Sequence, residues 1–205
     1  MKEYILDTNA YFEILRAEYD PDLKAKYADV LKTMRDGLLC ISEVTRIEII
    51  SVLGKYARGV TGGFQSCGSM ISEDGSICQN QRYTVPRKRW HKRKVKQWLK
   101  LIDEIHSGES ERFHVQVLPL NEQIVFEANK VILHALKNRF GSLDAMIAAT
   151  AADEAAKNKL IVVITSDKAL KQCLKKCQIQ YWDPFSETGH FSDDTEFSSE
   201  HGDLV

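Results

Sequence analysis

The sequence predicts an α/β fold in which helices flank a central, mainly parallel sheet. Segments that favour strands alternate with segments of helical periodicity, the order that produces a parallel sheet. The run from Leu160 to Ile164 is apolar without interruption, as is typical of a strand buried on both faces of such a sheet. A chain of 205 residues with 43% hydrophobic side chains suffices for one domain with a hydrophobic core.

The N-terminal part contains two short apolar runs, each followed by a helical pattern. Residues 4–6 are expected to form the first strand, and the apolar positions in 11–15 indicate a helix after it. Residues 38–41 form the second predicted strand. Ser42 is a good N-cap, and the apolar positions in 44–53 then follow helical spacing.

The middle of the chain breaks this alternation. Five glycines with interspersed serines interrupt 59–86, which is expected to be irregular. Helical spacing resumes at about Trp90 and continues to Ile105. Basic side chains occupy the first half of this helix, where they oppose the helix dipole.

The C-terminal half returns to the alternating order. A strand at 115–118 precedes a helix that Asn121 caps and that is expected to end near Gly141. Ser142 is expected to cap the next helix, which runs to about Lys157. The strand, helix and strand that complete the pattern are 160–164, a helix containing Leu170 and Leu174, and 179–182.

Residues 1–185 are therefore expected to form one domain, with a glycine-rich and basic insertion at about 56–93. Residues 186–205 are acidic, carry no Lys or Arg, and are expected to be a disordered tail. By contrast, 82–100 is rich in Lys and Arg and has no acid, which indicates a polyanionic partner.

The sequence gives no sign of a membrane or an export route. It has no run of about 18 apolar residues, the length a membrane span requires, and its first residues do not resemble a signal peptide. Its five cysteines are an odd number, and we expect them to be reduced thiols in the cytoplasm.

Four acidic residues are expected to meet at one edge of the sheet. Asp7 and Asp167 each follow a strand, while Glu48 and Asp144 lie near helix starts, which occupy the same edge in alternating α/β units. Clustered carboxylates repel unless a cation neutralises them, and Mg²⁺ or Mn²⁺ prefers such oxygen ligands. Ions held this way orient a water and stabilise the leaving oxygen in phosphodiester cleavage. The side chains expected to support the carboxylates or their waters are Thr8, Asn9, Thr165 and Ser166.

Each acid also has a purely structural interpretation. Asp7 and Asp167 are suited to cap the helices that follow them, and Asp144 complements a helix dipole. Glu48 is harder to explain in this way, because isoleucines flank it in mid-helix and an unpartnered buried carboxylate is costly. The four acids together favour a metal site, and Asp167 is the one most suited to act through water.

Four segments resemble the successive motifs of PIN-domain nucleases, and in particular VapC-type toxins of bacterial toxin–antitoxin pairs. The segments are 5–9 (ILDTN), 41–48 (ISEVTRIE), 142–151 (SLDAMIAATA) and 164–167 (ITSD). The resemblance covers about 3–58 and 94–185. It implies a PIN-like three-layer sandwich and a Mg²⁺- or Mn²⁺-dependent, single-strand-specific endoribonuclease. It also implies a homodimer held inactive by a small antitoxin, with metal ligands Asp7, Glu48, Asp144 and Asp167 and a supporting Thr165.

A basic segment is expected to contact RNA. Its Lys and Arg side chains suit phosphates and Trp90 suits stacking on an unpaired base, whether the RNA is single-stranded or structured. The alternative is a solvated helix face with Trp90 in the core. The residues predicted to bind RNA are Arg87, Lys88, Arg89, Trp90, Lys92, Arg93 and Lys94.

Two other functions remain open from the residues alone. Haloacid-dehalogenase phosphatases also place an aspartate after a strand, but they need a second aspartate two residues later, where this chain has Asn9. A non-catalytic RNA-binding adaptor would not need all four acids. Both alternatives are therefore weaker than the ribonuclease.

Overall fold

The computed structural model describes residues 2–66, 81–86, 88–111, 114–133, 141–157 and 159–185. The chain divides into two compact units. The first comprises Met1–Ile47 and His114–Val205, and the second comprises Glu48–Phe113. The predicted tail, 186–205, lies outside the described residues.

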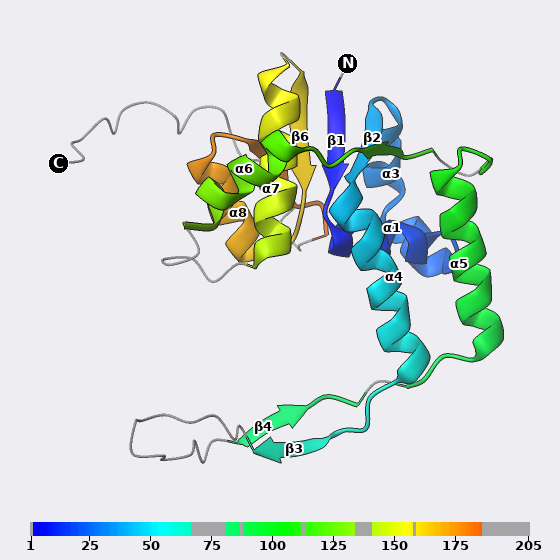
Figure 1. Cartoon of the computed structure of the whole chain (residues 1–205). Coiled ribbons are helices and arrows are strands. Elements are labelled where there is room, and N and C mark those ends of the chain that lie inside the picture. Colours follow the sequence, from blue (N-terminus) through cyan, green and yellow to red (C-terminus); the bar gives the residue numbers. More distant parts are fainter. Residues whose placement is uncertain are drawn as a thin grey trace, which may run out of the picture. The chain divides into compact units, whose positions relative to one another are not determined.

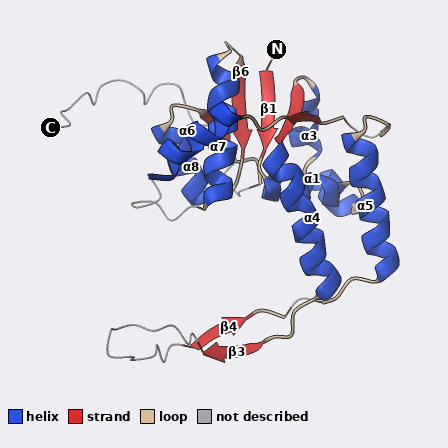
Figure 2. Ribbon diagram, in the orientation of Figure 1, coloured by secondary structure: helices blue, strands red, loops and turns tan. Residues whose placement is uncertain are grey.

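A five-stranded sheet with the order β5-β2-β1-β6-β7 forms the centre of the first unit (Figure 2). Every neighbouring pair in it is parallel, which confirms the predicted sheet. The strand order reverses beside β1, so that the crevice beyond the carboxyl ends of β1 and β6 is where a ligand is expected to bind. The strands are β1 (Lys2–Leu6), β2 (Leu38–Ser42), β5 (Gln116–Leu118), β6 (Leu160–Ile164) and β7 (Gln180–Trp182).

Helices flank this sheet, which confirms the α/β sandwich (Figure 1). Ile5 and Val163 belong to a buried cluster with side chains of α7 and α8, while α1 and α3 contact β1 and β2. Small residues of α7, such as Ala148, let this helix approach the sheet closely. The helices are α1 (Thr8–Ala17), α2 (Pro21–Lys26), α3 (Ala28–Arg35), α6 (Glu122–Val131), α7 (Ser142–Ala156) and α8 (Lys168–Lys176).

Side-chain caps set several of the helix starts. Ser42 Oγ accepts the Thr45 N–H at 3.0 Å at the start of α4 (Glu43–Arg58), and Asn121 Oδ1 accepts the Ile124 N–H at 2.8 Å, as predicted. The prediction for α7 was wrong by one residue. Gly141 is its N-cap, because the Asp144 carboxylate reaches back to accept the Gly141 N–H at 2.9 Å. Helix α6 ends at Val131, earlier than predicted, and 134–140 lie outside the described residues.

The second unit contains most of α4, the strands β3 (Gly63–Ser66) and β4 (Gln81–Thr84), and α5 (Lys92–His106). The two strands pair antiparallel. The prediction of an irregular 59–86 was therefore wrong in part. Phe64 and Tyr83 lie opposite each other with ring centroids 5.1 Å apart, and such cross-strand aromatic pairs stabilise a ribbon. No helix among the described residues is long and apolar enough to cross a membrane.

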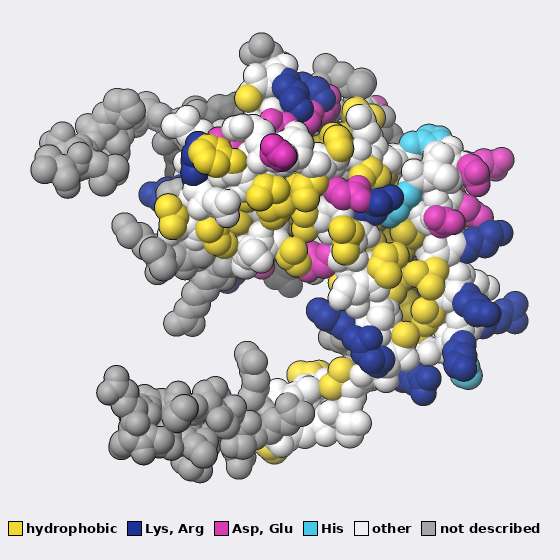
Figure 3. Space-filling model, viewed as in Figure 1, with side chains coloured by type: hydrophobic (Ala, Val, Ile, Leu, Met, Phe, Trp, Pro, Cys, Tyr) yellow, Lys and Arg dark blue, Asp and Glu magenta, His cyan; other side chains and the backbone are white. Residues whose placement is uncertain are grey.

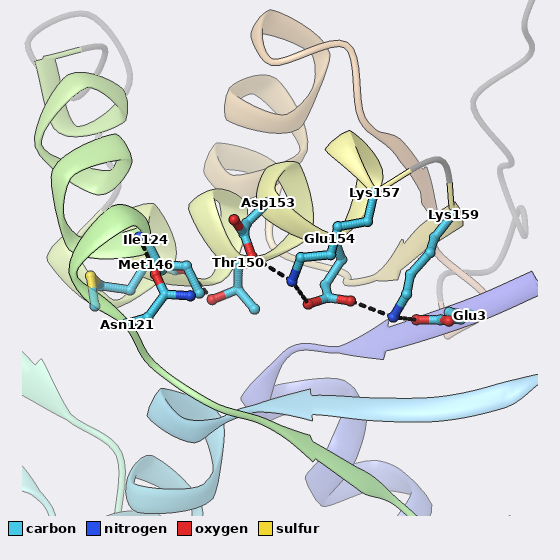
Figure 4. Close-up of polar contacts among 9 residues, drawn as sticks. All are labelled: Glu3, Asn121, Ile124, Met146, Thr150, Asp153, Glu154, Lys157 and Lys159. Carbon is cyan, nitrogen blue, oxygen red and sulfur yellow. Dashed lines mark hydrogen bonds and ion pairs between the residues drawn. The ribbon is translucent and has the colours of Figure 1, made fainter.

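An ion-pair network joins the end of α7 to the amino ends of β1 and β6 (Figure 4). Glu154 is buried, and its carboxylate accepts from Lys157 at 2.6 Å and from Lys159 at 2.5 Å. Lys159 also reaches Glu3 at 3.2 Å. Glu154 therefore neutralises two lysines at the edge of the sheet opposite the carboxyl ends of the strands.

Glu154→Gln is expected to lower the free energy of unfolding by about 2 kcal/mol at pH 7, as measured by urea denaturation. Breaking a fully buried ion pair would lower stability by more than this, but the two lysines are partly exposed, so water replaces part of the lost interaction. Burial opposes the charged carboxylate, yet the lysines outweigh it and lower the pKa of Glu154. The contribution is thus present above the ordinary carboxyl pKa and is lost as the pH falls through the lower folded value. Glu127→Gln, which removes the more exposed pair with Lys130, is the control and should cost under about 1 kcal/mol.

Candidate active site

Asp7 is the first residue after β1 and is only 3% exposed. Its N–H donates to the Ile164 carbonyl of the neighbouring strand at 3.1 Å. Its Oδ1 accepts the Ala10 N–H at 2.6 Å, so that Asp7 does cap α1. The capping role and a metal-binding role are compatible, because the first engages one of two carboxylate oxygens.

Thr165 links Asp7 to Asp167. Its Oγ1 donates to Oδ2 of Asp7 and accepts the Asp167 N–H at 3.0 Å. Thr165 is fully buried and directly follows β6, whose last residue, Ile164, pairs with Leu6 of β1. The parallel register therefore brings Asp7 and Thr165 side by side and fixes the direction of the Asp7 carboxylate.

The pKa of Asp7 is raised from 3.8 to about 6. Burial is the largest cause, and the negative charges of Asp167 and Asp144 raise it further, while the hydrogen bonds from Ala10 and Thr165 oppose the shift. Asp7, Asp144 and Asp167 thus share one electrostatic neighbourhood. A divalent cation would offset both the cost of burying the Asp7 charge and the repulsion among the three carboxylates.

Asp144 and Asp167 each also serve a helix start. Asp167 Oδ1 accepts from the N–H groups of Ala169 at 2.7 Å and Leu170 at 2.9 Å, and so caps α8. Asp144 lies half-buried in the first turn of α7, where its Oδ2 binds the Gly141 N–H. These contacts hold one carboxylate oxygen of each acid against a helix start.

Glu48 is half-buried in α4, and it belongs to the second unit. Of its isoleucine neighbours, Ile49 is buried, but Ile47 is 65% and Ile50 is 45% exposed. The expectation that flanking isoleucines bury this glutamate was therefore too simple, because a helix turns each neighbour by about 100°. That Glu48 completes the acidic cluster stays a prediction.

The donor set of Asp7, Asp144 and Asp167 has the chemistry that a hard divalent cation requires. In the part of the chain that the structure describes, no three Asp, Glu, His or Cys side chains already converge at metal-binding geometry. The burial and raised pKa of Asp7 nevertheless favour a bound cation, because a buried carboxylate without a counter-charge is costly.

The other predicted supporting residues have different surroundings. Thr8 is buried in the first turn of α1, and Asn9 is exposed. Ser166 Oγ lies 2.6 Å from Oδ1 of Asp183, an acid outside the predicted set of four. The Thr165 hydroxyl contacts both Asp7 and Asp167, as predicted for a supporting residue.

The predicted RNA-binding segment lies in the second unit, where Lys and Arg side chains gather over α5 and the end of α4 (Figure 3). Lys88, Arg89, Lys92, Arg93 and Lys94 are exposed, and Arg87 lies outside the described residues.

Trp90 anchors this segment to α4. Its ring lies 4.5 Å from that of Tyr56 and 5.0 Å from that of Trp98, and Lys94 Nζ lies 4.2 Å over it. The Trp90 N–H donates to the Tyr56 carbonyl at 3.0 Å, and the Arg89 side chain donates to the Ala57 carbonyl at 3.0 Å. Trp90 is half-buried among these contacts.

The sequence matches the model of the PIN domain over residues 4–174. The chain belongs to the PIN domain family. Members of this family are nucleases that generally use divalent metal ions. The predicted family is thus confirmed, and it favours the nuclease over the phosphatase. No curated protein is similar enough in sequence to count as a relative.

Several solved structures are similar to this chain at low sequence identity. VapBC-1 from nontypeable Haemophilus influenzae is 21% identical, with a TM-score of 0.49 over 88% of this chain and 97% of that chain. FitAcB from Neisseria gonorrhoeae is 15% identical, with the same score and coverage. VapBC2 from Rickettsia felis, bound to a DNA fragment, is 12% identical and has a score of 0.49 over 88% of this chain and 99% of that chain.

One acid at this edge of the PIN domain was missed in the sequence. Asp183 directly follows β7, is 2% exposed, and binds Ser166 and Lys171. Its position repeats the pattern that marked Asp7, a short apolar strand ending at an aspartate. That signal was present in the sequence, but Asp183 was not counted among the candidate acids.

Proposed function

We propose that this PIN domain is a metal-dependent endoribonuclease that cleaves phosphodiester bonds of single-stranded RNA, with Asp7, Glu48, Asp144 and Asp167 holding Mg²⁺ or Mn²⁺. The observation that carries the proposal is the Asp7 carboxylate, whose pKa is raised to about 6 mainly by burial and further by the charges of Asp167 and Asp144. Family membership supports the nuclease chemistry.

The chain's own residues prepare the site in three ways. Thr165 orients the Asp7 carboxylate, and the start of α8 holds one oxygen of Asp167. The burial of Asp7 excludes water from around its charge and strengthens its attraction to a cation. A bound divalent ion would supply an activated water and stabilise the leaving oxygen of the cleaved bond.

The proposal is tested with the full chain, a labelled single-stranded RNA and its duplex, in Mn²⁺, in Mg²⁺ and in EDTA. The single strand is expected to be cut in either metal, and not in EDTA. Asp144→Asn should abolish cutting, whereas Asp29→Asn, an exposed acid of α3, should cut as the wild type does. Binding of RNA without cutting in any metal would instead support the non-catalytic adaptor.

Neutralising Arg87, Lys88, Arg89 and Lys92 together is expected to weaken RNA binding by on the order of 10-fold or more at low salt. Each lost phosphate contact should also reduce the slope of log affinity against log salt by about 0.7. Fluorescence anisotropy across a salt series measures both quantities.

The matched control neutralises four exposed lysines of α2 and α8, namely Lys24, Lys26, Lys175 and Lys176. This variant loses as many charges, yet it should keep the wild-type salt slope. Equal slopes for the wild type and the basic-segment variant would exclude this segment from the RNA interface.

We further propose that the chain acts as the toxin of a toxin–antitoxin pair and forms a homodimer, because its motifs resemble those of VapC-type toxins. Exposed apolar side chains of α6, Val125 and Phe126, and Leu143 of α7 suit a protein partner. Co-expression with the product of a short adjacent reading frame should relieve growth arrest and yield a co-purifying complex. Expression without any growth defect would contradict the toxin role and leave the nuclease test unaffected.

A further inference from the structure

Asp183 directly follows β7, and the side chains that it contacts belong to the turn before α8 and to α8 itself. Oδ1 of Asp183 lies 2.6 Å from Ser166 Oγ, and Lys171 Nζ lies 2.7 Å from its Oδ2. Asp183 is only 2% exposed, so the contacts with Ser166 and Lys171 compensate for the hydration that its carboxylate loses on burial. These two contacts therefore restrain the parts of the chain that carry Ser166 and Lys171, namely the turn before α8 and the start of α8.

The restrained segment is the turn between β6 and α8, residues 165–167. Backbone hydrogen bonds also hold this turn at both of its ends. On one side, the Thr165 N–H donates to the Trp182 carbonyl at 3.0 Å, in register with the pairing of Ile164 and Trp182. On the other side, Lys171 lies one turn into α8, and its N–H donates to the Asp167 carbonyl at 3.0 Å.

The same turn carries the contacts of the proposed site. Thr165 donates to Asp7 and accepts from the Asp167 N–H, and Asp167 accepts from the first turn of α8. Movement of the turn would therefore displace both the carboxylate of Asp167 and the hydroxyl that orients Asp7. Asp183 lies outside this set but holds it in place.

We propose that Asp183, clamped by Ser166 and Lys171, is a positioning residue that fixes the turn 165–167 so that Asp7 and Asp167 can share a divalent cation. Asp183 is not itself a ligand, because the Lys171 ammonium occupies the place that a cation would take. This inference rests on the proposed metal site and extends it to a fifth acid of the sheet edge.

The test compares Asp183→Asn with Glu154→Gln, a second buried carboxylate paired with lysines. Glu154 stabilises the opposite edge of the sheet, so its loss lowers stability without disturbing the turn. Mn²⁺ binding by the full chain is measured by electron paramagnetic resonance. Asp183→Asn is expected to raise the Kd for Mn²⁺ by about 10-fold or more, whereas Glu154→Gln should leave it within about twofold.

A metal-independent measurement accompanies the binding assay. Amide hydrogen exchange in EDTA should be faster at Asp167, Ala169 and Leu170 in Asp183→Asn than in the wild type, because their N–H groups bond within the turn and the first turn of α8. Ser166→Ala, which removes a single hydroxyl, should show a smaller change of the same kind and serves if Asp183→Asn does not fold.

The outcomes separate the two proposals. A wild type that binds no Mn²⁺ overturns the proposed function, and the inference falls with it. A wild type that binds Mn²⁺, beside an Asp183→Asn or Ser166→Ala variant with unchanged Kd and unchanged exchange at Asp167, overturns the inference alone. A 10-fold loss of affinity in Glu154→Gln as well would show that Asp183 acts only through global stability.

Discussion

Asp7→Asn is expected to reduce RNA cleavage by on the order of 10³-fold, equivalent to about 4 kcal/mol of transition-state stabilisation. Asparagine keeps the size of the side chain and a carbonyl oxygen that can accept the Ala10 N–H, so that the cap of α1 persists. It removes the charge that a divalent cation requires. The loss is measured as initial cleavage rates of a labelled single strand over a range of Mn²⁺ concentrations.

The concentration series makes this prediction specific to the metal. Asp7→Asn should not recover at saturating Mn²⁺, and Mn²⁺ should raise the melting temperature of the wild type but not of the variant. Asp29→Asn, in the first turn of α3, is the control and should match the wild type in both assays. Cleavage by Asp7→Asn within about 10-fold of the wild type would remove Asp7 from the site.

The same substitution is expected to stabilise the protein when no metal is present. In the unfolded chain Asp7 has the ordinary pKa near 3.8, but in the folded chain the pKa is about 6. The folded state therefore holds a proton more tightly than the unfolded state does. Above pH 6 the ionised carboxylate costs up to about 3 kcal/mol of stability, and this cost disappears as the pH falls below 3.8.

Urea denaturation in EDTA at several pH values tests this second prediction. Asp7→Asn should be more stable than the wild type by about 2 kcal/mol at pH 7, and the difference should vanish near pH 4. Other carboxylates titrate in both proteins and cancel in the difference. A variant that is less stable than the wild type at pH 7 without metal would show that Asp7 is a structural cap and little more.

The sequence predicted the sheet well because its strands are short apolar runs and its helices carry strong caps. β6 is apolar throughout, and the N-cap residues Ser42 and Asn121 mark where the helices that they cap begin. The region between α1 and β2 was left unassigned, although Pro21 opens α2 and Asp20 caps it. Its helices are short, and α2 buries no side chain, so that no apolar periodicity marks it.

The site was predicted less completely than the fold. The acids after β1 and β6 were recognised because a strand followed by an aspartate is a local pattern. The bond from Thr165 to Asp7 joins residues far apart in the chain and depends on the parallel register of β1 and β6. The contacts of Asp183 with Ser166 and Lys171 likewise depend on strand order, which no local pattern contains.

A crystal structure of the full chain soaked in Mn²⁺ tests the central claim most directly. We expect anomalous density for Mn²⁺ beyond the carboxyl ends of β1 and β6, bound by oxygens of Asp7 and Asp144 at roughly 2–2.5 Å, with Asp167 bound directly or through water and Glu48 completing the set. Carboxylates that remain more than about 10 Å apart, with no density among them, would contradict a shared metal site.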